Sequence, residues 1–264
     1  MIDDIINASN KTKALILFTF LSVVGFMIYV QPISQDQNYH TFADPRTFLN
    51  IPNFFNVITN LAYLVPGALG MYYLQNNWTN KQKFVEPEET IPLYVIFLGS
   101  LLLAFGSGFY HLKPDNITLM ADRFTMTIGF MAVLSFIISE RISVKWGITL
   151  LPFLLVLGMA SVIYWITPEL YFNVGDLRPY ALVQTLSLLL ILIIYFLYPA
   201  KYSHGKYILY ALGLYVVAKF FETCDVEIYE SLHQLISGHS LKHLASGLGI
   251  YFILKYIQER KTLP

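Results

Sequence analysis

The chain is poor in charged residues and has almost no cysteine. Only 13% of its 264 residues are Asp, Glu, Lys or Arg, against roughly 25% in ordinary soluble domains. The formal net charge is zero, so nothing in the charge balance argues for a nucleic-acid partner. Cys224 is the single cysteine, which excludes an internal disulfide and is most simply a packed thiol. The sequence also has no low-complexity segment and no short repeat.

In place of charge, the chain has abundant apolar side chains. Hydrophobic residues make up 56% of the sequence, and the mean hydropathy is +0.55. They fall in long blocks and do not alternate with polar residues, a pattern typical of membrane spans. The length suits one integral membrane domain. We therefore expect an all-α, polytopic protein embedded in a membrane.

The apolar blocks predict where the membrane helices lie. A span needs about 20 predominantly apolar residues, and polar stretches containing Pro or Asn separate the blocks. The eight predicted spans cover residues 14–31, 53–75, 91–111, 118–140, 144–166, 179–198, 206–223 and 239–257. Residues 1–52 would form an additional N-terminal helix with the loop that follows it. Residues 53–264 would form a seven-helix membrane domain.

The first apolar block has two interpretations. It follows Lys11 and Lys13, as the apolar region of a signal peptide would. Its length is greater than usual for such a region, and no small-residue cleavage site precedes the polar stretch that follows, so a signal anchor is favoured. A cleaved signal peptide is the alternative, because the two kinds of segment overlap in composition.

Basic residues in the loops predict the orientation of the helices. Loops rich in Lys and Arg stay on the cytoplasmic side of a membrane. Eleven of the seventeen basic residues fall on one side of the predicted map: Lys11, Lys13, Lys81, Lys83, Arg141, Lys145, Lys201, Lys206, Lys255, Arg260 and Lys261. Both termini should therefore be cytoplasmic. Cleavage of the first block would leave the other seven helices in the same orientation.

Five polar side chains fall on the opposite, non-cytoplasmic side of this map. The third predicted helix ends there with Ser107 and His111, and the fourth begins there with Asp122. The last helix begins there with His239 and His243. A spacing of four residues puts each pair on one helix face. Because ionisable groups that face lipid are costly, we expect these side chains to meet inside the bundle.

The five residue types together suit a catalytic metal site. Three neutral imidazoles, here from His111, His239 and His243, can bind zinc tetrahedrally and leave a fourth position for water. Zinc lowers the pKa of that water to about 7. A carboxylate such as Asp122 can accept its proton and later deliver it to a leaving group. A hydroxyl such as Ser107 can donate to a developing oxyanion or orient the carboxylate.

Each of these residues also has a simpler interpretation. A single His-x3-His pair is weak evidence for a metal, and histidines at helix ends often bond to the backbone. Small residues such as Ser107 commonly line helix interfaces in membranes. Asp122 is compatible with a pair with Arg123 or with a position near a helix N-terminus. The convergence of all five on one leaflet favours the metal centre.

The order of these motifs resembles the alkaline ceramidase family. Ser-x3-His ends one helix and Asp follows eleven residues later, in "GSGFYHLKPDNITLMADRF". His-x3-His opens the last helix, in "GHSLKHLASGLGIYF". The resemblance covers residues 53 to 257 approximately. The family belongs to a larger group of seven-helix membrane proteins that includes the progestin and adiponectin receptors.

The resemblance implies a reaction and a role for each residue. His111, His239 and His243 would be zinc ligands, Asp122 the general base and Ser107 the oxyanion partner. The implied activity is hydrolysis of a ceramide-like lipid amide to a sphingoid-type base and a free fatty acid, at the non-cytoplasmic leaflet. The host would be the cell membrane of a bacterium, or the endoplasmic reticulum or Golgi of a eukaryotic cell. The first predicted helix is additional to the family's seven.

One departure from the family concerns calcium. The animal ceramidases carry an acidic, tryptophan-containing calcium site before their first core helix. In this chain Asn53 stands where a carboxylate would be expected. Zinc is therefore the expected cofactor, and calcium binding is not expected at this position.

Two other functions are compatible with the same residues. A receptor-like member of the superfamily would keep the zinc site for structure, but the tail "QERKTLP" and small cytoplasmic loops leave little surface for a signalling partner. A metal transporter would need polar groups through the whole membrane, whereas the cytoplasmic halves of the relevant helices are mostly apolar.

Several further polar residues are expected to play local roles. The pairs Asp44–Arg46 and Asp176–Arg178 lie on the side of the proposed site. A local salt bridge or turn cap is favoured for each, and gating or binding of a polar lipid head group is the alternative. Lys219 and Glu222 should form a pair within their helix. Asp225 should lie in a solvated polar loop. His40 has no histidine at ligand spacing and should be a surface residue.

Overall fold

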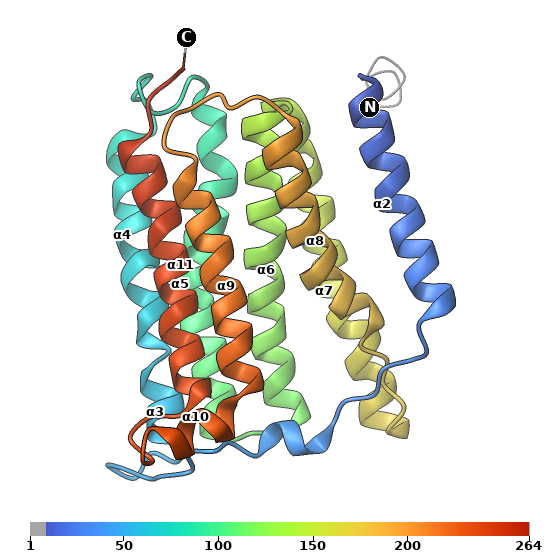
Figure 1. Ribbon diagram of the computed structural model, residues 1–264, viewed down its shortest axis with the longest axis vertical. Coiled ribbons are helices and arrows are strands. Elements are labelled where there is room, and N and C mark those ends of the chain that lie inside the picture. The colour runs from blue at the N-terminus through green and yellow to red at the C-terminus, as the bar shows by residue number, and fades with distance from the viewer. Residues whose placement is uncertain (1–8, 264) are drawn as a thin grey trace.

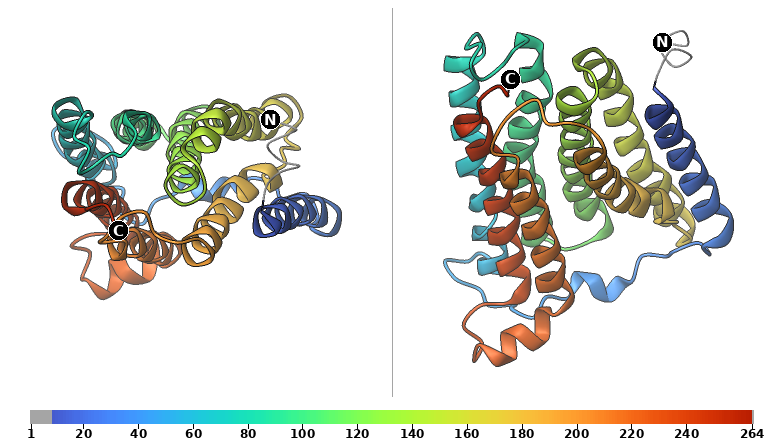
Figure 2. Two further views of the ribbon diagram at one scale, coloured as in Figure 1. Left: turned by 90° about the horizontal axis from the view of Figure 1, so that it is seen from above. Right: turned by 45° about the horizontal axis from the view of Figure 1, so that its top comes forward.

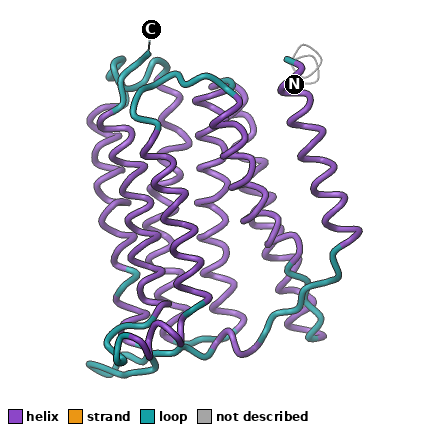
Figure 3. Tube along the Cα trace, in the orientation of Figure 1, coloured by secondary structure: helices purple, strands orange, loops and turns teal. Residues whose placement is uncertain are grey.

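The structure is a computed structural model that describes residues 9–263, and this part of the chain is a helical bundle without a β-sheet (Figure 1; Figure 3). The predicted all-α class is confirmed. The long helices are α2 (Asn10–Tyr29), α4 (Leu61–Asn77), α5 (Thr90–Leu112), α6 (Asn116–Arg141), α7 (Val144–Phe172), α8 (Arg178–Leu197), α9 (Lys206–Thr223) and α11 (Gly238–Glu259). The short ones are η1 (Gln37–His40), α3 (Phe54–Ile58), η2 (Pro87–Glu89) and α10 (Asp225–Ser231).

Most of these helices could cross a membrane. Within residues 9–263, six helical segments are long and apolar enough, and a seventh is added if α9 and α10, which bend by 80° where they meet, count as one span. These segments support a multi-pass membrane protein. Helices occupy all eight predicted ranges, but α11 is not among the candidate spans, because its Ser, His, Lys and Gly residues reduce its hydropathy. The eighth span therefore stays a prediction.

A short turn joins α5 to α6 and sets the level of two predicted site residues. Asp115 caps α6, because its carboxylate accepts the backbone N–H of Thr118 at 2.8 Å. The Thr118 hydroxyl in turn accepts the backbone N–H of Asp115 at 3.1 Å. This reciprocal pair satisfies donors that a helix N-terminus otherwise leaves unpaired. The sharp reversal brings His111, at the end of α5, and Asp122, near the beginning of α6, to the same end of the bundle.

Helix α4 packs closely against α11 beside a proline. The sequence predicts one helix over 53–75, but the structure divides it into α3 and α4 at Thr59 and Asn60. Within α4, Pro66 has no N–H to donate to the carbonyl of Ala62 one turn earlier. A Cβ atom on Gly247 of α11 would lie 2.5 Å from the oxygen of that carbonyl. The absence of a side chain at Gly247 therefore permits the close approach of the two helices.

Replacing Gly247 by alanine should lower the free energy of unfolding by about 1–3 kcal/mol, the usual cost of overpacking. The methyl group would meet backbone, which cannot rotate away. Gly249→Ala is the matched control on the same helix, because its nearest neighbour would be the Ala211 oxygen at an ordinary 3.4 Å. Thermal unfolding of the purified variants in detergent measures both. Equal midpoints would contradict the close approach.

Helix α2 lies at one edge of the bundle, beside α8 (Figure 1; Figure 2). The Thr12 and Tyr198 hydroxyls form a hydrogen bond of 2.9 Å near its beginning. Arg178 donates to two carbonyl groups at its end, at 2.8 and 2.7 Å. The predicted Asp176–Arg178 salt bridge is confirmed at 2.8 Å. Burial alone would raise the pKa of Asp176, but the hydrogen bonds from Arg178 outweigh burial and keep that pKa below its ordinary value.

The beginning of α2 and the end of α11 lie at one end of the bundle, and the loop between α2 and α3 crosses the opposite end (Figure 1). That loop contains η1 and connects the edge helix to the far side of the bundle. Helix α5 ends and helix α11 begins at the end that the loop crosses. The predicted site residues therefore lie at the end of the bundle that this loop covers.

A buried ionic network closes the other end of the bundle. Arg260 has no exposed surface and donates to Glu140 at 3.2 Å and to Glu89 at 3.4 Å. Its Nε also donates to the backbone carbonyl of Lys83 at 2.8 Å. The Tyr202 hydroxyl donates to Glu89 at 2.6 Å. This network ties the end of α11 to η2 and α6.

Candidate metal centre

Three histidine side chains meet inside the bundle, as the sequence predicts. His111 comes from the end of α5, His239 and His243 come from the start of α11, and all three are buried. One nitrogen from each ring lies within 4.8 Å of the others, and Nε2 of His111 lies 3.2 Å from Nε2 of His243. Two ligands bound tetrahedrally to zinc at roughly 2.0–2.1 Å are about 3.3 Å apart. This pair therefore has the spacing of zinc ligands.

A threonine fixes which nitrogen of His243 is available. The Thr59 hydroxyl donates its proton to the carbonyl of Phe55 at 2.6 Å. The same oxygen lies 2.9 Å from Nδ1 of His243, so it accepts a hydrogen bond from a protonated Nδ1. A neutral imidazole protonated at Nδ1 has its lone pair on Nε2. Nε2 is the nitrogen that faces His111, so Thr59 orients His243 for metal binding.

Replacing Thr59 by valine, which has the same shape without the hydroxyl, should weaken metal affinity by about 10- to 100-fold, as loss of a ligand-orienting partner typically does. The valine leaves Nδ1 of His243 without its acceptor and frees the ring to rotate. Thr59→Ser keeps the hydroxyl and is the control. Titration of the metal-stripped protein against a chromophoric chelator gives both affinities. A valine variant that binds metal as tightly as the serine variant would refute the orienting role.

The start of α11 is fixed by its contacts with α9 and α10. Asp225 accepts the backbone N–H of His239 at 2.7 Å and that of Ala43 at 3.1 Å. The expectation that Asp225 lies in a solvated loop is wrong. Asp225 is the first residue of α10, and the axis of α10 is bent by 80° from that of α9. A Cβ atom on Gly238 would lie 2.2 Å from the carbonyl oxygen of Phe221. Glycine therefore lets α11 begin in contact with α9.

The loop before α3 covers the histidines. Phe42 is buried, and its ring centroid lies 4.8 Å from that of His111 and 4.9 Å from that of His239. The expectation that His40 is a surface residue is wrong: it is half-buried, and its Nδ1 lies 3.1 Å from the Tyr110 hydroxyl. Aromatic contacts between the loop and α5 thus shield the centre from the end of the bundle.

The predicted catalytic pair lies in the same region. Ser107 and Asp122 are both buried, and both line the same cavity as His243. Within residues 9–263, Oδ1 of Asp122 has no hydrogen-bond partner. A buried carboxylate oxygen normally has one. This oxygen is therefore free to accept a proton or a hydrogen bond from a bound molecule.

An elongated cavity connects this pair with the middle of the bundle. Its polar end is formed by Ser107, Asp122 and His243 together with residues of α9. Farther from the histidines its wall is apolar and includes Ile96, Leu103, Val133, Ile191, Leu212 and Ile253. A cavity with apolar walls and a few polar groups at one end is typical of a small-molecule site.

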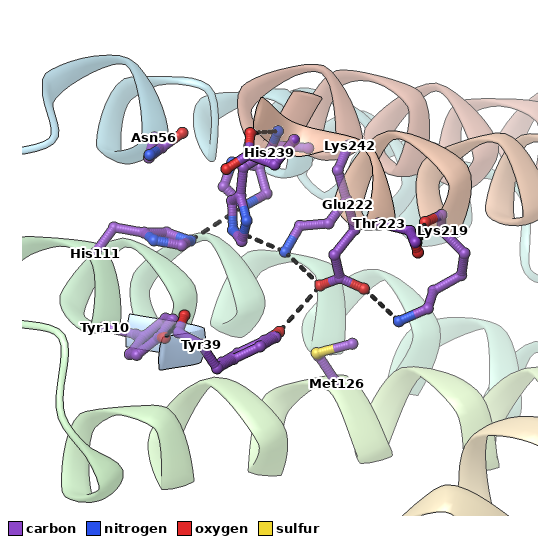
Figure 4. A network of polar contacts seen from close by, with 12 residues as sticks. Tyr39, Asn56, Tyr110, His111, Met126, Lys219, Glu222, Thr223, His239 and Lys242 are labelled. Carbon is purple, nitrogen blue, oxygen red and sulfur yellow. Dashed lines mark hydrogen bonds and ion pairs between the residues drawn. The ribbon is translucent and has the colours of Figure 1, made fainter. Parts of the chain in front are cut away.

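A second polar network adjoins the histidines, and sequence reasoning missed most of it (Figure 4). The predicted Lys219–Glu222 ion pair within α9 is confirmed. Glu222 also accepts from Lys242 of α11 at 3.1 Å and from the Tyr39 hydroxyl at 3.0 Å. Lys242 Nζ lies 2.9 Å from Nε2 of His239. Lys242 follows His239 by three residues, and this spacing was the one feature of the sequence that placed the two side chains on the same helix face.

Other polar residues singled out in the sequence are used elsewhere. The predicted Asp44–Arg46 salt bridge is confirmed at 2.7 Å. Arg123 does not turn toward the histidines but stacks over the Trp165 ring at 4.1 Å. The Asn53 side chain donates to a carbonyl in the last turn of α5 at 2.9 Å. These contacts hold the segments around the centre in place.

Comparison with known proteins gives no identification: no protein-family model matches the chain, and no curated protein matches it. The geometry of the centre is therefore the basis for assigning a function. Within residues 9–263, the three histidines form the single cluster of three or more metal-ligating side chains. Three buried imidazoles suit zinc, and they also suit several other transition metals. The protein thus contains a group that can bind a metal ion.

Proposed function

We propose that this protein is a zinc-dependent hydrolase that cleaves the amide bond of a ceramide-like membrane lipid. One observation carries the proposal: three buried imidazoles with nitrogens within 4.8 Å of one another adjoin a buried carboxylate at the polar end of an apolar cavity. The resemblance of these motifs to those of the alkaline ceramidases supports the same choice. His111, His239 and His243 would hold the ion.

The remaining residues have roles that follow from their positions. Zinc, when bound, supplies a Lewis acid and a water molecule of lowered pKa. Asp122 takes the proton of the attacking water on its unpartnered Oδ1 and delivers it to the leaving nitrogen. Ser107 has one proton, with which it either holds the carboxylate or donates to the oxygen that gains charge. The products are a sphingoid-type base and a free fatty acid.

The cavity suits a substrate with a long apolar chain. Aliphatic side chains line the part farther from the histidines, so an acyl chain placed there would be removed from polar surroundings. The amide group would then lie near Ser107, Asp122 and His243, which line the other end. A water-soluble amide would gain little from the apolar walls. This distribution favours a lipid over a peptide.

The proposal includes a membrane topology. Eight helices cross the bilayer, of which α2 is additional to a core of seven that ends with α11. Both termini are then cytoplasmic, and the histidines lie toward the non-cytoplasmic leaflet. The observation behind this arrangement is that the two ends of the described chain share one end of the bundle (Figure 1). The end of α5 and the start of α11, which carry the three histidines, lie at the other end.

The test is hydrolysis of a panel of N-acyl lipids by purified protein in detergent, with the zinc content measured in parallel. Wild-type protein should contain near-stoichiometric zinc and release fatty acid from at least one lipid. His243→Ala should lose both zinc and activity, because it removes one of three ligands and the orienting contact with Thr59. His204→Ala, at an exposed loop position, is the matched control and should lose neither.

The possible results separate the candidate functions. Zinc with no turnover of any lipid would contradict the hydrolase and favour a receptor-like or structural site. Absence of zinc from the wild type would contradict the metal centre itself. Turnover that survives in His243→Ala would show that the reaction occurs elsewhere.

A further inference from the structure

A lysine ammonium group adjoins one of the three candidate ligands. Lys242 Nζ lies 2.9 Å from Nε2 of His239 and 3.1 Å from Oε1 of Glu222 (Figure 4). The side chain of Lys242 is only 14% exposed and that of Glu222 only 13% exposed, so surrounding atoms hold both groups in place. One cation therefore bridges a candidate metal ligand and a carboxylate.

The contact with His239 cannot persist when that histidine binds a metal ion. An ammonium group donates hydrogen bonds and accepts none, so at 2.9 Å Lys242 uses the lone pair of Nε2. In a metal-bound neutral imidazole, one nitrogen binds the ion and the other carries a proton. Neither nitrogen then has a lone pair for Lys242. The exclusion holds whichever nitrogen of His239 binds the ion.

We propose that Lys242 is an internal competitor for the metal ion: it must leave His239 when the ion binds, and Glu222 then holds it. The proposal rests on the metal-dependent function proposed above. Lys242 is on this view a positioning residue that sets the metal affinity of the centre. Lys242 would then determine metal affinity in addition to the three histidines and to Thr59, which orients His243.

The surroundings of Glu222 suit it to receive the displaced ammonium group. Oε1 of Glu222 already accepts from Lys242 and from the Tyr39 hydroxyl at 3.0 Å. Its other oxygen binds Lys219. Because a charge without a partner is costly inside a membrane, Lys242 needs a partner after it leaves His239. Glu222 provides one without exposing the ammonium group to lipid.

The experiment measures the zinc dissociation constant of the full chain in detergent, by competition with a chromophoric chelator. Lys242→Met should bind zinc about 10- to 100-fold more tightly, which is the range typical of changes next to metal ligands. Glu222→Gln should bind about 10-fold more weakly, because Lys242 loses the partner that draws it away from His239. Lys219→Met removes an ammonium group from the same carboxylate and should leave the affinity unchanged.

A double variant tests whether Glu222 acts through Lys242. If it does, Glu222→Gln combined with Lys242→Met should bind zinc as tightly as Lys242→Met alone. A general electrostatic effect of the carboxylate would instead weaken binding in both backgrounds and would contradict the receiving role. The absorption spectrum of the cobalt-substituted protein adds a second readout, because an unchanged three-nitrogen site should give the same bands in each variant.

An unchanged or weakened affinity of Lys242→Met would overturn the proposal. Lys242→Gln, which is also neutral, replaces it if the methionine variant fails to fold, and Lys242→Arg keeps the charge and should not bind more tightly than wild type. If Lys242→Met binds zinc more tightly but the wild type hydrolyses no lipid, this inference is supported and the proposed hydrolase is wrong. Lipid turnover by the wild type, together with an unchanged zinc affinity in Lys242→Met, would overturn this inference and leave the proposed hydrolase in place. No zinc in either wild type or Lys242→Met would overturn both.

Discussion

Asp122→Asn should reduce the turnover number by about 100- to 10,000-fold, the usual contribution of a general acid–base group, while the zinc content stays at the wild-type level. The amide keeps the size and shape of the carboxylate, but it cannot take the proton of the attacking water. Asp122 is not among the three ligands, so its loss should not release the ion. Fatty-acid release and zinc content, measured on the same preparation, give the two numbers.

Asp115→Asn is the control for this prediction. Asp115 lies on the same helix hairpin but caps α6 and does not line the cavity. Asparagine is as good an N-cap as aspartate, so activity and stability should both stay near wild type. If Asp122→Asn kept full activity, the proton would have another acceptor. If it lost zinc, Asp122 would be a ligand and its proposed role would be wrong.

Arg260→Met should lower the free energy of unfolding by about 3–5 kcal/mol, the cost of leaving a buried ionic network without one partner. The variant would leave Glu89 and Glu140 buried, with side chains 2% and 1% exposed, and without the guanidinium group between them. Lys201 and Arg141 would still contact one carboxylate each. Denaturation in mixed detergent, followed by circular dichroism, measures the loss.

A surface ion pair on the same helix is the comparison. Lys255 and Glu259 form an i,i+4 pair at 3.4 Å with both side chains more than one third exposed, so Lys255→Met should change the stability little. Removing the charges together, in Glu89→Gln, Glu140→Gln and Arg260→Met combined, should recover part of the stability that Arg260→Met alone loses. An Arg260→Met variant as stable as Lys255→Met would mean that the network contributes nothing.

The helices and the meeting of the five polar residues could be predicted from sequence because both depend on local signals. Apolar runs mark the helices, and spacings of four residues put side chains on one face. The turn at Asp115 brings α5 and α6 together. Some boundaries differ. The predicted span 53–75 is divided into two helices, which depends on how α4 meets α11, and α7 continues to Phe172, six residues beyond its predicted end at 166.

The contacts that orient the site could not be predicted in the same way. Thr59 and His243 are 184 positions apart, and nothing in the sequence near either residue links them. Asp225 was expected in a loop because its neighbours are acidic. The bend between α9 and α10 instead brings its carboxylate to the backbone N–H of His239, at the start of α11. Such contacts depend on how helices are placed in three dimensions. The exception is Lys242, whose spacing from His239 was visible in the sequence.

The distribution of the histidines along the chain has a consequence for biogenesis. During synthesis the hairpin of α5 and α6 is completed well before α11, and it carries His111 and Asp122. The other two histidines arrive only with α11, after α7, α8 and α9 have been made. Until then, the polar groups of the hairpin lack the partners that offset the cost of burying them. The addition of α11 is therefore the step that completes the centre, and a metal ion can be bound by all three histidines only after that step.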